Sequence, residues 1–252
     1  LTMVAPLVFG ILGARKRNIR QLLFAMGVFV AFAAGSLVSG SRTAAITSGM
    51  MLVAYLVGRL LFSKARNKVG AAVAVLVVLA LTALFAYLFR DAIGVTQTRF
   101  EQAAEAENFF ERVLTVLFGE PWVYDLVRWL GYGVGFGSNL ATYVRTGSAD
   151  VFALAEAEGG RILMEGGVLG FAYIALKYVV VALGLLSSLR VSIRTNSPFA
   201  VLVWLTTALA VVSWPALGQL TANALLGLML AYGLLVLRYP RLEIFPSRAS
   251  RS

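Results

Sequence analysis

The stretch E-A-E-G-G-R-I-L-M-E-G-G-V-L-G, residues 156–170, leads into an apolar run that continues to residue 186. It places three glutamates and one arginine at the mouth of a segment long enough to cross a lipid bilayer. A charge at the centre of a membrane helix costs roughly 2.5–3.5 kcal/mol on insertion scales, so such residues usually pair or line a polar cavity. The stretch therefore predicts a spanning helix with a functional site at its entrance.

The composition places the whole chain in the membrane class. Of its 252 residues, 60% are hydrophobic and 13% are charged, and the mean hydropathy is +0.83. Several apolar runs approach or exceed the roughly 20 residues that a spanning helix needs, which predicts an all-α, polytopic transmembrane helical bundle. The chain has no cysteine and no histidine, so thiolate metal sites and the commonest metal ligand and general base are absent. We expect neither a metal nor a cofactor.

Basic clusters alternate with the apolar runs and predict the orientation. An apolar run at residues 1–12 is short for a span, which suggests that the chain is the C-terminal part of a larger protein. Six expected spans follow, at residues 21–38, 44–62, 71–88, 167–186, 199–212 and 220–237. Every basic cluster falls on the same side of this zigzag, which the positive-inside rule places in the cytoplasm. The net charge of +10 is therefore interpreted as topology and not as nucleic-acid binding.

One long polar section interrupts the spans. Residues 90–165 hold eleven of the 12 acidic residues and six arginines, so we expect a large extracytoplasmic loop. Within it, residues 96–118 are expected to form an amphipathic helix that stops at Gly119, and Pro121 to begin a short interfacial helix ending near Leu130. The predicted organisation is transmembrane helices over residues 1–90, the loop over 91–155, transmembrane helices over 156–238 and a cytoplasmic tail over 239–252.

Glycine occupies every second position of residues 131–137, in G-Y-G-V-G-F-G. Such a run cannot hold a stable helix, because glycine has the greatest backbone freedom to lose. Its N–H groups could contact a phosphate, as glycine-rich loops do elsewhere. The pattern alone favours a flexible turn between the interfacial helix and the rest of the loop.

Three arginines are candidates for contact with a phosphate. Arg42 lies in a turn at the outer end of a span, and its planar fork matches phosphate oxygens; the alternative is an arginine that extends to the membrane interface. Arg99 and Arg112 are thirteen residues apart, which on one straight helix leaves them about 140° apart around the axis. Both can reach one phosphate only if the helix breaks, and a surface ion pair is the alternative for one of them.

The opening stretch contains the candidate catalytic groups. Glu158, Arg161 and Glu165 recur at i, i+3 and i+7, on one face of a helix, and a structural Glu–Arg–Glu network at the end of the span is one interpretation. Alternatively, a carboxylate beside an apolar surface accepts a proton from a substrate hydroxyl, the task that histidine performs in many enzymes. Glu156 and Glu158 are the candidates for this role.

Taken in order, four motifs resemble the O-antigen ligase and O-antigen polymerase superfamily. They are S-G-S-R-T at residues 39–43, T-R-F at 98–100 ahead of Arg112, the alternating glycines, and the opening stretch. The resemblance covers about residues 38–186. It implies an integral-membrane, metal-independent glycosyltransferase of the bacterial inner membrane, which uses undecaprenyl-diphosphate-linked glycans at the periplasmic face.

The resemblance also implies roles for individual residues. Arg42 would bind the donor diphosphate, with Arg99 and Arg112 assisting, and Arg161 and Glu165 would complete the substrate site. The ligase pattern has a histidine followed by asparagine nine residues before Glu165's position, where this chain has Glu156 and Ala157. This departure favours a polymerase of repeat units over a ligase and leaves the base open between the two candidate glutamates.

The expected partners are the lipid-linked donor, an acceptor glycan and the bilayer, with chain-length regulator and flippase proteins of the same pathway. Two rival functions are a lipid or sugar transporter and a non-catalytic subunit of polysaccharide assembly. A transporter is expected to place its ionisable residues near the bilayer midplane, often on broken helices. Here they cluster at one outer face, which favours glycosyl transfer.

Overall fold

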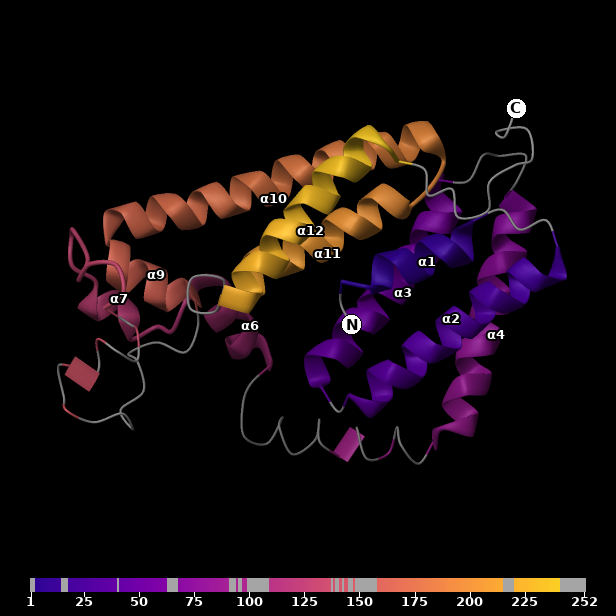
Figure 1. Ribbon diagram of the computed structural model, residues 1–252, viewed down its shortest axis with the longest axis horizontal. Helices are drawn as coiled ribbons and strands as arrows, with labels where there is room; N and C mark the ends of the chain where they lie inside the picture. The colour runs from indigo at the N-terminus through magenta and orange to yellow at the C-terminus, as the bar shows by residue number, and fades with distance from the viewer. Residues whose placement is uncertain are drawn as a thin grey trace. The chain divides into compact units, whose positions relative to one another are not determined.

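The computed structural model describes residues 3–14, 18–39, 41–62, 68–90, 94, 97–98, 109–136, 138, 141, 143–144, 147, 158–214 and 220–240. Its described elements are all helices, and the described residues contain no strand (Figure 1). The helices are α1 (Ala5–Gly13), α2 (Ile19–Val38), α3 (Arg42–Phe62), α4 (Lys68–Leu88), α6 (Phe109–Phe118), α7 (Val123–Leu126), α9 (Glu158–Gly166), α10 (Val168–Thr195), α11 (Phe199–Ser213) and α12 (Leu220–Arg238). The all-α prediction is confirmed.

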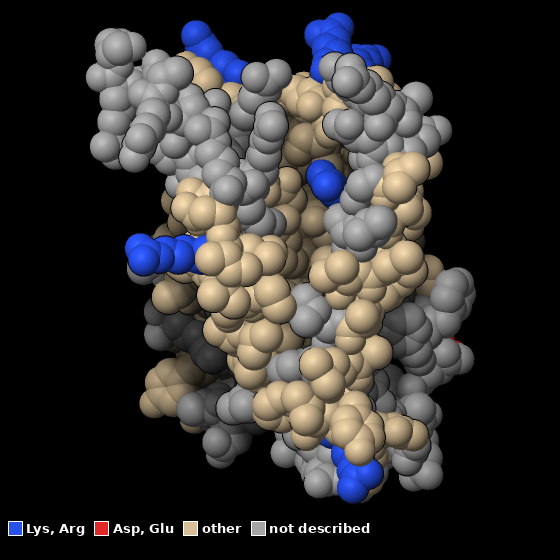
Figure 2. Space-filling model, turned by 90° about the vertical axis from the view of Figure 1, so that its right-hand side faces the viewer, with Lys and Arg blue, Asp and Glu red and all other residues tan. Residues whose placement is uncertain are grey.

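Four of the six expected spans are helices long and apolar enough to cross a membrane. These segments are Ile19–Ser36, Ala44–Phe62, Val168–Thr195 and Thr221–Arg238. Helix α11 is shorter, and among the described residues of α4 the apolar segment covers Val75–Leu84. Figure 2 shows one face on which most of the described surface is uncharged and the basic side chains stand mainly at its ends, as suits helices in contact with lipid. The chain is a multi-pass membrane protein.

Helix α10 extends beyond the span expected at residues 167–186. It continues to Thr195, so Arg190 and Arg194 lie on the helix itself. No helix breaker occurs before Asn196, which has a φ of 54° and is followed closely by Pro198. A left-handed residue followed by proline ends a helix, because the proline ring cannot continue it.

The described part of the polar section contains α6 and α7. Helix α6 ends at Phe118, directly before Gly119, which has a φ of 86°, so the expected stop is found, and much of the predicted segment before Phe109 lies outside the described residues. Helix α7 ends at Leu126, so the prediction that this helix ends near Leu130 is wrong. The reason is the extended backbone of Val127, with φ −64° and ψ 121°, which starts a separate turn.

The chain divides into two compact units. Unit 1 comprises Leu1–Ala103, Leu185–Thr206 and Ala231–Ser252, and unit 2 comprises Ala104–Gly184 and Thr207–Leu230. Helices α10, α11 and α12 contribute to both. The division by membrane side stays a prediction from sequence.

Unit 1 packs around aromatic rings and buried hydroxyl groups. The ring of Phe9 in α1 stacks on Tyr55 of α3, with a centroid distance of 5.3 Å. The Ser36 and Ser48 hydroxyls, 3.1 Å apart, join α2 to α3, and the indole N–H of Trp204 donates to the Gly233 carbonyl at 2.9 Å. Such small and polar contacts are typical between membrane helices, where lipid removes most of the hydrophobic driving force.

Candidate functional site

Helices α9 and α10 form an antiparallel hairpin in unit 2. Gly167, with a φ of 53°, separates them. Ile162, in the middle of α9, lies against Gly170 near the start of α10, and Glu158, at the start of α9, contacts Lys177 further along α10. Earlier residues of α9 thus meet later residues of α10. At Gly170 an added Cβ would collide with the Ile162 carbonyl, so the two backbones approach as closely as only glycine allows.

A buried ion pair joins the two arms of the hairpin. The Lys177 ammonium lies 2.9 Å from a Glu158 carboxylate oxygen, and the two side chains are 14% and 5% exposed. Lys177 lies nine residues into α10, about 13.5 Å along its axis at 1.5 Å per residue. Lys177 is not among the site residues predicted from the sequence, although one ionisable residue inside an apolar run is itself an indication of a functional or paired position.

A second ion pair lies within α9. The Nε of Arg161 is 2.8 Å from Oε1 of Glu165, at the i, i+4 spacing, and Glu165 is buried. The expected grouping of Glu158, Arg161 and Glu165 on one short helix is therefore found, with Lys177 as an added member. Because the hydrogen bonds between ions are about twice as strong as neutral ones, the two pairs hold these side chains in defined positions.

The glycine segment, residues 131–136, caps the C-terminal end of α9. The N–H groups of Tyr132 and Gly133 donate to the carbonyls of Met164 and Glu165, at 2.8 and 3.1 Å. In return, the N–H of Val168 donates to the Trp129 carbonyl at 3.0 Å. The N–H groups of Tyr132 and Gly133 therefore already have acceptors and do not point to a phosphate. The segment is held in place by the carbonyl groups at the end of α9, whose hydrogen-bonding capacity it satisfies.

The close approach at Gly131 predicts a selective effect of alanine. Gly131 has a φ of 69°, and an added Cβ would collide with the Glu165 carbonyl. Gly133 has a φ of 95° but open space around an added Cβ. Gly133→Ala is expected to lose only the roughly 1–2 kcal/mol of an unfavourable φ, and Gly131→Ala to lose more. Thermal unfolding in detergent measures both, and equal losses would show that the contact with α9 is loose.

Helix α6 is fixed against the hairpin at its C-terminal end. The hydroxyls of Tyr178 and Tyr124 donate to the carbonyls of Leu117 and Phe118, each at 2.6 Å. An added Cβ at Gly119 would lie 2.6 Å from the nitrogen of Gly160. Gly159 and Gly160 of the opening stretch thus have no side chains where the end of α6 contacts α9, which allows the two backbones to approach.

The predicted aromatic interface lies beside the hairpin turn. Trp122 and Tyr124 are half exposed, and Trp129, whose carbonyl binds the turn, is 78% exposed. Trp and Tyr are enriched at membrane interfaces because their rings are apolar and their tips polar. Exposed aromatic side chains therefore lie next to the charged hairpin, and their position at a membrane interface stays a prediction.

The other predicted site residues are not brought into this cluster by the described side chains. Arg42 begins α3 in unit 1, where the Ser41 hydroxyl caps the helix by accepting the Ala44 N–H at 3.3 Å; the Arg42 side chain is outside the description. Arg112 lies on α6, again with its side chain outside the described part. Arg99 and Glu156 lie outside the described residues altogether.

The described site is a charge-balanced cluster. Within the residues that the structure describes, no three acidic side chains gather as metal ligands would. Two carboxylates meet two cations at the junction of a short helix with a spanning one, and these ion pairs orient α9. No family model, curated protein or solved structure matches the chain. A function must therefore be argued from the residues and their geometry.

Proposed function

We propose that the chain is a membrane glycosyltransferase that joins undecaprenyl-diphosphate-linked oligosaccharide repeat units at the periplasmic face of a bacterial inner membrane, as O-antigen polymerases do. The observation that carries the proposal is the α9–α10 hairpin, where four buried or half-buried charges meet beside an interfacial aromatic segment. A lipid-linked sugar has its reactive bond near the membrane surface, where the sequence predicts the hairpin, because its diphosphate stays among the headgroups while its lipid tail enters the bilayer.

The reaction is a displacement at the anomeric carbon of the donor. A hydroxyl oxygen of the acceptor glycan forms a bond to that carbon, and the bond from the carbon to the diphosphate oxygen breaks. The hydroxyl proton passes to a glutamate, and the electron pair of the broken bond leaves with undecaprenyl diphosphate. Arginines stabilise the charge that develops on the diphosphate.

The ion pairs divide the roles of the site residues. Glu158 is held by Lys177, which gives it a structural task and favours Glu156, two residues before α9, as the proton acceptor. Glu158 is the second candidate for that role. Arg161 and Glu165 position the hairpin, and Arg42, Arg99 and Arg112 are assigned to the donor diphosphate.

One observation favours a transporter as a second candidate function. Lys177 lies well inside the spanning helix α10, opposite the short helix α9, and Gly167 separates the two helices. Ionisable groups at broken helices are typical of transport pathways. A transporter would move the lipid-linked glycan across the membrane and leave its length unchanged. Formation of glycosidic bonds is therefore the property that separates the two functions.

Polymer formation by the purified full-length protein tests the proposal. In liposomes that contain an undecaprenyl-diphosphate-linked repeat unit of the source bacterium, the wild-type protein should produce a ladder of longer glycans. Arg42→Lys keeps the charge but loses the two-pronged geometry, so the rate should fall roughly tenfold or more. Arg190→Lys, at an exposed position on α10, is the matched control and should leave the rate unchanged.

Two of the following outcomes would speak against this function, and the one that concerns Arg42→Lys would speak only against the role of Arg42. A protein that moves the lipid-linked unit between leaflets without lengthening it is a transporter. A protein that lengthens glycans equally well as Arg42→Lys binds the diphosphate elsewhere. A protein that does neither alone but is needed in the presence of other membrane proteins is a non-catalytic subunit.

A further inference from the structure

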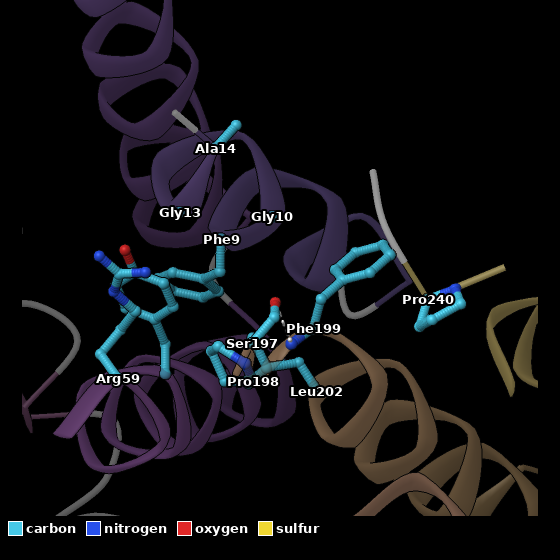
Figure 3. A pocket seen from close by; sticks show the side chains of 11 residues that line it. Phe9, Gly10, Gly13, Ala14, Arg59, Ser197, Pro198, Phe199, Leu202 and Pro240 are labelled. Carbon is cyan, nitrogen blue, oxygen red and sulfur yellow. Dashed lines mark hydrogen bonds between the residues drawn. The ribbon is translucent and has the colours of Figure 1, made fainter. Parts of the chain in front are cut away.

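A cavity of about 150 Å³ lies in unit 1, where several helix ends meet (Figure 3). It is lined by Gly13 at the end of α1, Arg59 in the last turn of α3, Ser197 between α10 and α11, and Pro240 just after α12. One buried water needs only about 10–15 Å³ on this scale, so the cavity admits a larger group. All four segments belong to the side of the zigzag that the basic clusters place in the cytoplasm.

The lining combines an apolar wall with groups that favour an anion. Phe9, Phe199 and Leu202 supply apolar surface, and Arg59 supplies a half-buried guanidinium. The Ser197 hydroxyl accepts the Phe199 N–H at 3.3 Å and so caps α11, whose first residues line the cavity. The N-terminus of a helix carries a partial positive charge, which adds to that of the arginine.

The charge of unit 1 acts in the same direction. Unit 1 carries 17 of the 22 basic residues but only three of the 12 acidic ones, and those three, Asp91, Glu101 and Glu243, lie outside the described residues. Two exposed arginines, Arg194 and Arg238, lie within three residues along the chain of Ser197 and Pro240, which line the cavity. An excess of positive charge in the unit that holds the cavity attracts anions to it.

We propose that this cavity binds a phosphate group, presented by the headgroup of an anionic phospholipid of the cytoplasmic leaflet. Arg59 holds the phosphate, the partial positive charge at the start of α11 adds to the attraction, and the apolar wall receives the glycerol part. Basic pockets between membrane helices on the cytoplasmic side are suited to anionic headgroups. The alternative is that the Arg59 charge only compensates the partial negative charge of the carbonyl groups at the end of α1. In that case the protein would not distinguish an anionic lipid from a zwitterionic one.

Native mass spectrometry of the full-length protein, with thermal unfolding in the same detergent, tests this assignment. The probes are dioleoylphosphatidylglycerol, dioleoylphosphatidylcholine and inorganic phosphate. The wild-type protein should retain phosphatidylglycerol in preference to phosphatidylcholine and unfold at a higher temperature when it is present. Arg59→Gln should weaken retention roughly tenfold or more, as expected for loss of a charged hydrogen bond. Arg190→Gln removes the same charge from an exposed site outside the cavity and should retain the lipid.

A second variant covers the case in which Arg59→Gln does not fold. Ala14→Leu adds bulk at a residue that lines the cavity and leaves Arg59 in place, so it should also lower retention. Equal retention of phosphatidylglycerol in wild type, Arg59→Gln and Ala14→Leu, or equal retention of both lipids by wild type, would overturn the proposal. Full protection by inorganic phosphate, with no added effect of the lipid, would overturn the lipid source and assign the site to free phosphate.

Discussion

Lys177→Ala is expected to destabilise the protein by about 3–5 kcal/mol, the typical cost of removing one partner from a buried ion pair. The reason is that Glu158, whose side chain is only 5% exposed, would lose the neighbouring Lys177 charge in a poorly solvated place. Unfolding in detergent, followed by helix content, measures the loss. Arg190→Ala, at an exposed position of the same helix, is the matched control and should stay within about 0.5 kcal/mol of wild type.

The double variant Lys177→Leu with Glu158→Leu separates pairing from charge. Replacing both members of a buried pair by apolar residues is often neutral or stabilising, so the double variant should recover much of the stability that Lys177→Ala loses. If Lys177→Ala itself is as stable as wild type, the pair does not hold α9 to α10. A transporter would keep its fold in the double variant but lose transport, because the charges would then be part of its pathway.

Glu156→Gln is expected to lower the rate of polymer formation by roughly 10²- to 10⁴-fold, the usual loss when a general base is removed. Glutamine keeps the size and most hydrogen bonds of the side chain but cannot accept the proton. The variant should bind donor and unfold as wild type does, because Glu156 lies before the start of α9 and its change leaves both ion pairs of the hairpin intact. Polymer length and unfolding temperature are measured on the same preparation.

Glu158→Gln should behave differently. It leaves Lys177 without its carboxylate partner, so stability should fall together with the rate. A Glu158→Gln protein that folds normally but does not turn over, beside an active Glu156→Gln protein, would exchange the two assignments. Normal polymer formation by both variants would mean that neither glutamate is the base, and that positioning and departure of the diphosphate carry the reaction.

Local sequence signals predicted the helices well because a spanning helix satisfies its own backbone hydrogen bonds. The apolar runs at 44–62 and 220–237 correspond closely to α3 and α12. The stop at Gly119 was also local, since glycine adopts a positive φ without strain. The short α7 and the long α10 were less predictable, because turn residues after Leu126 and before Pro198 decide where those helices end.

The candidate site was predicted only in part. The face shared by Glu158, Arg161 and Glu165 follows from helix periodicity, and the structure places all three on α9. Lys177 was missed because it is 19 residues from Glu158 and meets it only after the chain reverses at Gly167. The glycine segment was interpreted as a flexible turn, because its partners on α9 are about thirty residues further along the chain.

By itself, the sequence determined the membrane class, the helical composition and the position of the charged stretch at the start of a span, because burial in lipid and helix periodicity depend on neighbouring residues. Only the tertiary structure decided that α9 folds back along α10, that Lys177 binds Glu158 and that the glycine segment caps α9. These are contacts between distant parts of the chain. They form where glycine backbones let two segments approach and where a buried charge must find an opposite one.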